Sequence, residues 1–108
     1  MKNKYLFLFF IFTHTFANSQ TNLDSLYGIW EDKTKPDSSR IKALDDYIWF
    51  GHVYSKPDKA IILSDTLFEF SKKRGNKKVM ATALNMKGLA YSNKGDYLKA
   101  IQHHQSSL

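Results

Sequence analysis

The 108-residue sequence predicts an all-α protein in which helical hairpins stack side by side. Apolar residues recur at helical spacing, tight-turn signals separate these segments, and the second half of the chain resembles the first at a fixed offset. Ala43-Leu44 matches Ala83-Leu84, and Lys59-Ala60-Ile61 matches Lys99-Ala100-Ile101. Helix pairs that repeat every ~20–50 residues indicate a solenoid, because one pair cannot bury its apolar face alone.

Residues 1–19 are predicted to be a secretory signal peptide. Two lysines precede the apolar run YLFLFFIF, and polar and small residues follow it, in the order typical of export signals. The run is too short to span a bilayer, which takes ~20 residues. We expect cleavage before Gln20, with a cut after Ala17 as the alternative and a buried N-terminal segment as the competing interpretation. The mature protein would then lie in the periplasm or outside the cell.

Residues 20–36 are expected to form a short leading helix and a polar linker that ends at Pro36. The apolar residues of the helix follow the spacing i, i+3, i+4 and i+7, which places them on one face. These residues are Leu23, Leu26, Tyr27 and Trp30.

Residues 37–76 are predicted to form the first hairpin. Its first helix should run from about Asp37 to Tyr54, capped by Asp37, Ser38 or Ser39. Its second helix should be capped by Ser55, with Pro57 in the first turn, and should end at Gly75-Asn76.

Residues 77–108 are predicted to form the second hairpin. A helix from Lys77 to about Asn93 is followed by the turn Lys94-Gly95-Asp96 and by another helix without a stop signal. That last helix would expose Ala100, Ile101 and Leu108 with nothing to pack on. We therefore expect the chain to be the N-terminal part of a longer protein.

The segment ALNMKGLAYSNKGDYLKAI resembles the tetratricopeptide repeat (TPR). The matching positions are Leu84, Gly88, Tyr91, Gly95, Asp96, Tyr97, Ala100 and Ile101. The resemblance implies that Gly88 and Ala100 are small where the two helices cross, which lets their backbones approach closely. Residues 37–76 depart from the pattern, because Ile48 stands in place of the glycine and Gly51 in place of the aromatic residue; Ala60 is retained.

The order of signal peptide, LDSLYGIWED helix, ALDDYIW helix and repeated helix pairs is similar to the periplasmic sensory region of bacterial TPR-containing signalling proteins. This resemblance implies a membrane anchor beyond residue 108 and an output domain, first an adenylate or guanylate cyclase, otherwise a histidine kinase or a DNA-binding regulator. The alternative is a free-standing secreted or periplasmic TPR adaptor without enzymatic output.

No catalytic motif is present, so we do not expect this chain to be an enzyme by itself. The chain has no cysteine, phosphate-binding loop, HExxH or GxSxG motif. The neighbours His103 and His104 should point ~100° apart on a helix, which disfavours a shared metal. Asp45-Asp46 diverge in the same way and are expected to be solvated. We expect no cofactor and no metal.

A protein or peptide is the expected partner. In the TPR family the first helix of each pair lines a concave surface, which implies a set of binding residues with Asn85 and Trp49 at its centre. The set is Lys42, Asp45, Trp49, His52, Thr82, Asn85, Leu89 and Ser92. An ordinary solvent-facing role is the alternative for each, and Trp49 could equally belong to the core.

The formal net charge of +6 is densest at Lys72, Lys73, Arg74, Lys77 and Lys78. A soluble helix end is the default interpretation of this cluster, and an anionic partner is the alternative. We do not expect nucleic-acid binding, and self-association remains open.

Overall fold

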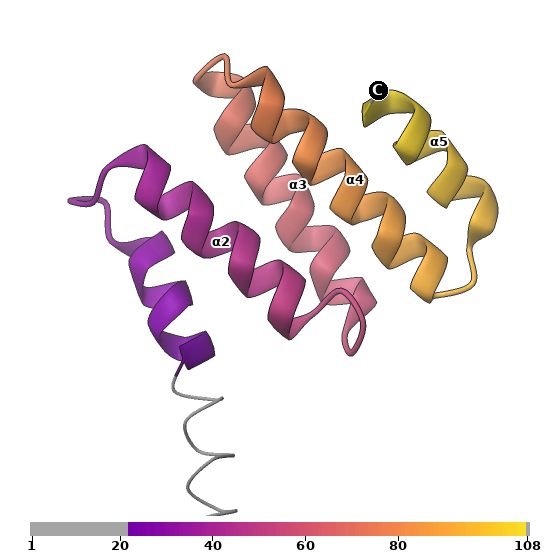
Figure 1. The fold of residues 1–108 in the computed structure, drawn as a ribbon, viewed down its shortest axis with the longest axis horizontal. Helices are drawn as coiled ribbons and strands as arrows, with labels where there is room; N and C mark the ends of the chain where they lie inside the picture. The colour runs from indigo at the N-terminus through magenta and orange to yellow at the C-terminus, as the bar shows by residue number, and fades with distance from the viewer. Residues whose placement is uncertain (1–21, 108) are drawn as a thin grey trace, which may run out of the picture.

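The computed structural model describes residues 22–107, which are helical apart from short turns and contain no strand. A leading helix at residues 22–31 is followed by α2 (Asp37–Gly51), α3 (Pro57–Lys73), α4 (Lys77–Asn93) and α5 (Tyr97–Ser107). Helices α2 to α5 run antiparallel to their chain neighbours (Figure 1). The all-α prediction is confirmed. The predicted signal peptide and both cleavage positions lie outside the described residues. None of the helices within residues 22–107 has the length and apolarity to cross a lipid bilayer.

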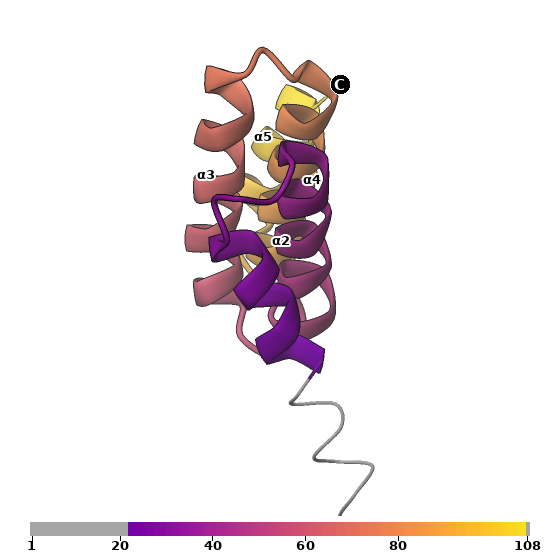
Figure 2. The ribbon, with the colours of Figure 1, turned by 90° about the vertical axis from the view of Figure 1, so that its left-hand side faces the viewer.

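A helical hairpin occurs twice, and the two copies keep the same offset along the chain. Helix α2 begins at residue 37 and α4 at residue 77, while α3 begins at residue 57 and α5 at residue 97. The small residues of the sequence match are buried in both hairpins: Ala43 and Ala83 on the first helices, and Ala60 and Ala100 on the second. Figure 2 shows α2 and α4 on one side of the molecule and α3 on the other.

The beginnings of α2 and α3 differ from the predicted caps. Helix α2 has Pro36 at its cap position and no side-chain cap, so capping by Asp37, Ser38 or Ser39 was wrong. The Asp37 carboxylate instead accepts a hydrogen bond of 2.7 Å from Arg74 Nε. Helix α3 begins at Pro57 as expected, but its cap is Lys56, because the Ser55 hydroxyl donates back to the Gly51 carbonyl oxygen. Helix α2 therefore ends at Gly51, before the predicted Tyr54.

The two remaining turns follow the sequence signals. Gly75 has a φ of +66° and Gly95 a φ of +86°, a left-handed conformation that other residues rarely adopt. The Asn76 side chain then caps α4 by accepting a hydrogen bond from the Val79 N–H. Asp96 accepts in the same way from the Lys99 N–H at the start of α5.

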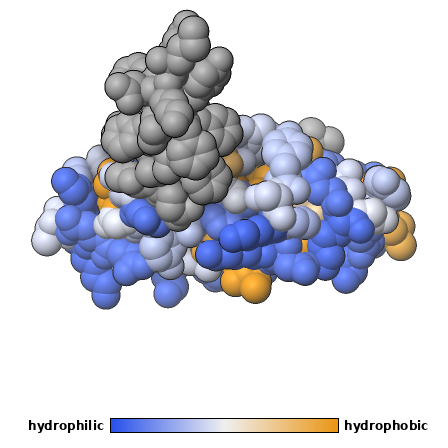
Figure 3. Space-filling model, turned by 90° about the horizontal axis from the view of Figure 1, so that it is seen from below, coloured by the Kyte–Doolittle hydropathy of each residue, from blue (hydrophilic) through white to orange (hydrophobic). Residues whose placement is uncertain are grey.

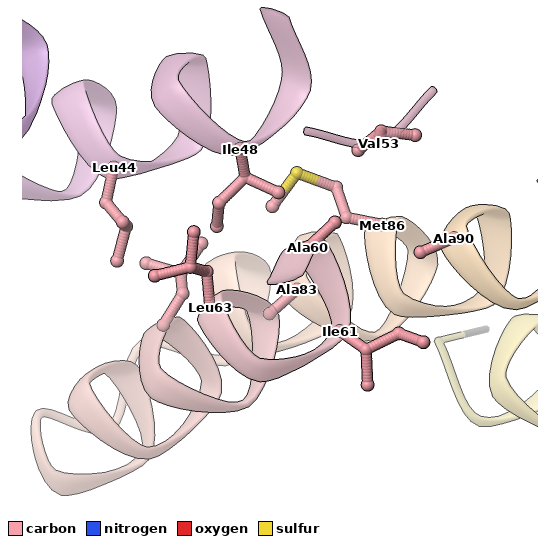
Figure 4. Close-up of a cluster of buried hydrophobic side chains, with 10 residues drawn as sticks. Leu44, Ile48, Val53, Ala60, Ile61, Leu63, Ala83, Met86 and Ala90 are labelled. Carbon is pink, nitrogen blue, oxygen red and sulfur yellow. The ribbon is translucent and has the colours of Figure 1, made fainter. Parts of the chain in front are cut away.

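The core lies between α2, α3 and α4, where apolar side chains from all three helices meet (Figure 4). Removal of this apolar surface from water is the main stabilising term. The most deeply buried large residues are Leu44, Ile48, Val53, Leu67 and Met86. On the outside, the surface seen in Figure 3 is mostly hydrophilic, with separate hydrophobic patches.

Gly88 lies directly against α5. A Cβ added there would be 3.2 Å from the Ala100 backbone oxygen and 3.2 Å from His104 Nε2. The predicted close approach is therefore present, and Ala100 is buried against it rather than exposed. At the corresponding places in the first hairpin, the equivalents of Gly88 and His104 are Ile48 and Ser64, both buried. In the first hairpin the large residue of the pair is Ile48 on the first helix, whereas in the second hairpin it is His104 on the second helix.

Candidate functional site

Two ion pairs join α3 to α4. Lys94 Nζ lies 2.5 Å from Asp58 Oδ1, and Lys87 Nζ lies 2.7 Å from Asp65 Oδ1. The two acids are seven residues apart on α3, and the two lysines are seven apart on α4, which is two helical turns. The face of α4 that carries Lys87 and Lys94 therefore lies toward α3, and the other faces of α4 contact α5 or solvent.

Asn85 is the exposed member of the predicted set on α4. Its side-chain oxygen lies 2.8 Å from His104 Nδ1 on α5, so the imidazole N–H donates to it. Because that contact occupies the amide oxygen, the amide nitrogen keeps two N–H donors for an external acceptor. The contact between His104 and Asn85 was missed from the sequence, where His104 was considered only as a neighbour of His103.

The other three predicted residues of α4 are only partly exposed. The Thr82 hydroxyl donates to the Lys78 carbonyl oxygen one turn earlier. Leu89 packs against the core, and Ser92 is also partly covered. These side chains form the floor around Asn85 and have little polar capacity of their own for a partner.

On α2 the predicted residues combine charge with an aromatic ring. Lys42 is exposed and forms an ion pair of 3.0 Å with Asp46, one turn later. Asp45 is half-buried, and this burial raises the pKa of its carboxyl, with a smaller contribution from neighbouring Asp46. The Trp49 side chain is 37% exposed and meets Tyr54 edge-on. Trp49 is thus one of two large apolar side chains that α2 exposes to solvent, and the neighbouring Phe50 is exposed further, at 73%.

His52 lies inside the protein, with only 5% of its surface exposed. Its Nδ1 lies 3.0 Å from the Tyr47 carbonyl oxygen, to which the imidazole N–H donates. Its ring lies against the Tyr47 ring at a tilt of 51°, with the centroids 4.5 Å apart. Burial lowers the pKa of His52, and the hydrogen bond to Tyr47 opposes this shift. His52 is therefore separated from the surface that Lys42 and Trp49 reach.

The neighbouring histidines of α5 diverge as expected. His103 stacks on Tyr91, with ring centroids 5.2 Å apart, while His104 turns toward Asn85. Burial lowers the pKa of His103, helped by the nearby charge of Lys87. Among residues 22–107, no three acidic or histidine side chains come together as a metal site.

Comparisons with protein-family models, with curated proteins and with solved structures find no match to this chain.

The basic cluster at the α3–α4 turn is exposed throughout. Arg74 is paired with Asp37, but the four lysines make no ion pair within the described part of the chain. Lys72 and Lys73 complement the negative end of the α3 dipole, whereas Lys77 and Lys78 stand at the positive end of α4, where cations are unfavourable by ~0.3–1 kcal/mol each. The default interpretation of a soluble helix end therefore explains the positions of Lys72 and Lys73, but not those of Lys77 and Lys78.

Proposed function

We propose that this chain is a TPR-like protein–protein interaction module that binds a peptide or partner domain on the face formed by α2 and α4. The recurrence of both helix starts at one offset, from residue 37 to 77 and from 57 to 97, carries the proposal. This recurrence matches the repeated pair of helices expected from the sequence. The close approach of Gly88 to Ala100, at the position where TPR helices cross, supports it further.

The chemistry of this face suits an extended peptide. Asn85 offers amide donors whose direction is set by His104, and a peptide carbonyl or carboxylate is the matching acceptor. The exposed Trp49 ring on α2 offers apolar area at low entropic cost. Charge from Lys42 and Asp45 at the same face would add selectivity more than affinity.

We further propose that the module is exported and serves as the sensory part of a larger signalling protein, with an adenylate or guanylate cyclase as its output. The support is the resemblance of this chain to such sensory regions. Sequencing the gene beyond codon 108 tests this setting: more repeats, a hydrophobic span and a cyclase domain are expected, whereas a stop codon after a few repeats would favour the free-standing adaptor. N-terminal sequencing of the secreted protein tests export, and a retained Met1 would contradict it.

The binding face is tested by NMR titration of the ¹⁵N-labelled protein with a random peptide pool and then with the peptides that bind. Signals of Asn85 and of the Trp49 indole should shift first. Asn85→Ala should weaken binding about tenfold, as expected for a lost hydrogen bond to a charged or main-chain acceptor. Gln102→Ala removes an exposed amide from α5 and serves as the matched control. Shifts confined to residues outside α2 and α4 would contradict the proposal.

His104→Ala separates orientation from contact. Because His104 acts only through Asn85, its removal should weaken peptide binding in the Asn85 protein and have no further effect in the Asn85→Ala protein. Additive losses would show instead that His104 touches the peptide itself.

A further inference from the structure

A groove of about 590 Å³ lies along α3, away from the predicted α2–α4 face. Its apolar lining consists of Trp30 of the leading helix and of Ile62 and Phe70 of α3. The polar and charged lining also comes from α3 and consists of Asp65, Thr66, Glu69, Lys73 and Arg74. Pockets of this volume are typical of ligand sites in proteins. The stretch from Ile62 to Arg74 rises ~18 Å along the helix, a length that about six extended peptide residues cover.

The aromatic end of the groove is built before any ligand arrives. The rings of Trp30 and Phe70 meet edge-to-face with centroids 4.8 Å apart. The Arg40 guanidinium lies 5.0 Å from both ring centroids, and its Nε donates to the Trp30 carbonyl oxygen. Pre-ordered walls of this kind reduce the entropy that a ligand must lose to bind.

The apolar floor of the groove continues to Ile62, whose side chain is 65% exposed although it belongs to a well-formed helix. A large aliphatic side chain in an open hollow next to two aromatic rings favours an apolar anchor from a partner. Thr66 also lines this stretch, but its hydroxyl already donates to the Ile62 carbonyl oxygen.

The charges around the groove are asymmetric. Two carboxylates line the groove: Asp65, toward the Ile62 end, which is already paired with Lys87 at 2.7 Å, and the exposed Glu69, one turn before Lys73. At the other end Arg74 lies 3.4 Å over the Phe70 ring, and Lys73 lines the groove without an ion pair among residues 22–107. The unpaired lysines 72, 77 and 78 continue the positive charge around the adjoining turn. Arg74 is paired with Asp37, and Glu69 lies one turn before Lys73, but the lysines outnumber these two carboxylates at this end. The Lys73 end therefore keeps an excess of positive charge that is complementary to carboxylates.

We infer that this groove binds an acidic peptide segment with one apolar anchor residue. The anchor fills the hollow between Ile62, Phe70 and Trp30, and the carboxylates that follow it reach Lys73 and the lysines of the turn. A flat bilayer surface does not enter a groove between two helices. Nucleic-acid bases would have to displace the guanidinium groups that already lie over the aromatic rings. The site is independent of the α2–α4 face, so either surface can fail without the other.

Trp30 reports directly on the groove. The chain has two tryptophans, so Trp49→Phe leaves Trp30 as the single tryptophan, whose emission can be excited selectively at wavelengths that tyrosine does not absorb. The probe is a synthetic peptide of about six to ten residues with one phenylalanine followed by glutamates. We expect a saturable change in Trp30 fluorescence, and a matching shift of the Trp30 indole N–H signal in the NMR spectrum of the unmodified protein.

Two exposed side chains test the assignment without threatening the fold. Lys73→Gln should weaken binding about fivefold through lost charge, and Ile62→Gln by a similar factor through lost apolar contact. Lys56→Gln makes the same change as Lys73→Gln at an exposed lysine next to the opposite end of α3, and should leave binding within about twofold. Circular dichroism of each variant checks that the helices are retained.

Peptides in which serine replaces the phenylalanine, or lysine replaces each glutamate, should give no saturable change. Phosphatidylglycerol vesicles and a single-stranded oligonucleotide are the two competing anionic probes. The inference is overturned if these probes move the Trp30 signals while the acidic peptide does not, or if Lys73→Gln binds the peptide as tightly as the unmodified protein.

Discussion

The side-chain amide of Asn93 donates a 2.8 Å hydrogen bond to the backbone oxygen of Val53, a residue 40 positions earlier in the chain. Asn93 is the last residue of α4, and Val53 lies fully buried in the turn between α2 and α3. The bond therefore joins corresponding places in the two hairpins, and it fixes how far one hairpin is shifted along the other.

Asn93→Ala should lower the free energy of unfolding by about 1–2 kcal/mol. The substitution leaves the carbonyl of the buried residue Val53 without this donor. That loss of free energy exceeds the gain of a few tenths of a kcal/mol from the better helix propensity of alanine. Urea unfolding followed by circular dichroism measures the change. Gln105→Ala, on the exposed side of α5, is the control and should change stability by less than about 0.5 kcal/mol. Equal losses in the two variants would mean that the bond does not hold the hairpins together.

The order, starts and turns of the helices could be predicted from the sequence because they depend on local features. Apolar spacing located all the helices, and Pro57, Gly75 and Gly95 act within a few residues of their own positions. The caps of α2 and α3 were mispredicted because Asp37 pairs with Arg74, which lies 37 residues away in the sequence, and because Ser55 bonds back to α2.

The candidate site was harder to predict for the same reason. Spacing placed Asn85 and Trp49 on the surface, where the structure has them. The partnership of Asn85 with His104 and the burial of His52 against Tyr47 depend on how separate segments meet, which no local pattern encodes. The groove beside Trp30 and Phe70 is also formed by residues from separate helices, so the sequence pattern of either helix alone does not predict it.

Gly88→Ile should destabilise the protein by about 1–3 kcal/mol. A side chain at this position meets the Ala100 backbone and the His104 ring, and such overpacking outweighs the improved helix propensity of about 0.5 kcal/mol. Thermal and urea unfolding give the measurement. Gly28→Ile is a matched control, because a Cβ at Gly28, also within a helix, would meet nothing within 4 Å. A loss of similar size at both glycines would argue against crowding as the cause.

His104→Ser should recover about half or more of the stability lost in Gly88→Ile. The double variant gives the second hairpin the arrangement of the first, in which Ile48 and Ser64 occupy the corresponding positions. A double-mutant cycle with His104→Ser alone should show a favourable coupling of about 1 kcal/mol or more. Additive effects would mean that the two hairpins cross differently despite their common spacing.

Ser64→Ala and Ser71→Ala should each stabilise the protein by about 0.5–1.5 kcal/mol. Both serines are buried in α3, and neither hydroxyl has a hydrogen-bond partner within the described part of the chain. Removing an unsatisfied buried hydroxyl recovers its desolvation cost, and alanine is also the better helix former. Urea unfolding of the single and double variants checks this. Lower stability would show that the hydroxyls are bonded in solution, for example to a buried water. Ser38→Ala, at an exposed position near the start of α2, is the control for helix propensity.

His52 should make the protein less stable as the pH falls. Burial lowers its pKa below the ordinary value of 6.5, so around and below that pH the unfolded chain binds a proton that the folded chain resists. The stabilising contribution is therefore complete above the unfolded pKa and is lost as the pH falls below it. Burial also lowers the pKa of His103, so His103 contributes to the same loss of stability as the pH falls.

The variant that isolates this effect is His52→Asn, whose amide can still donate to the Tyr47 carbonyl oxygen. Urea unfolding at about pH 8 and about pH 5.5 should show a smaller loss of stability in His52→Asn than in the unmodified protein. Comparing the two proteins at each pH removes the contribution of the carboxylates, which titrate in both. His103→Asn should also reduce the loss of stability between these two pH values, independently of His52→Asn. If His52→Asn and the unmodified protein lost equal stability between these two pH values, His52 would be able to take up its proton within the folded chain, and its side chain would have to reach water in solution.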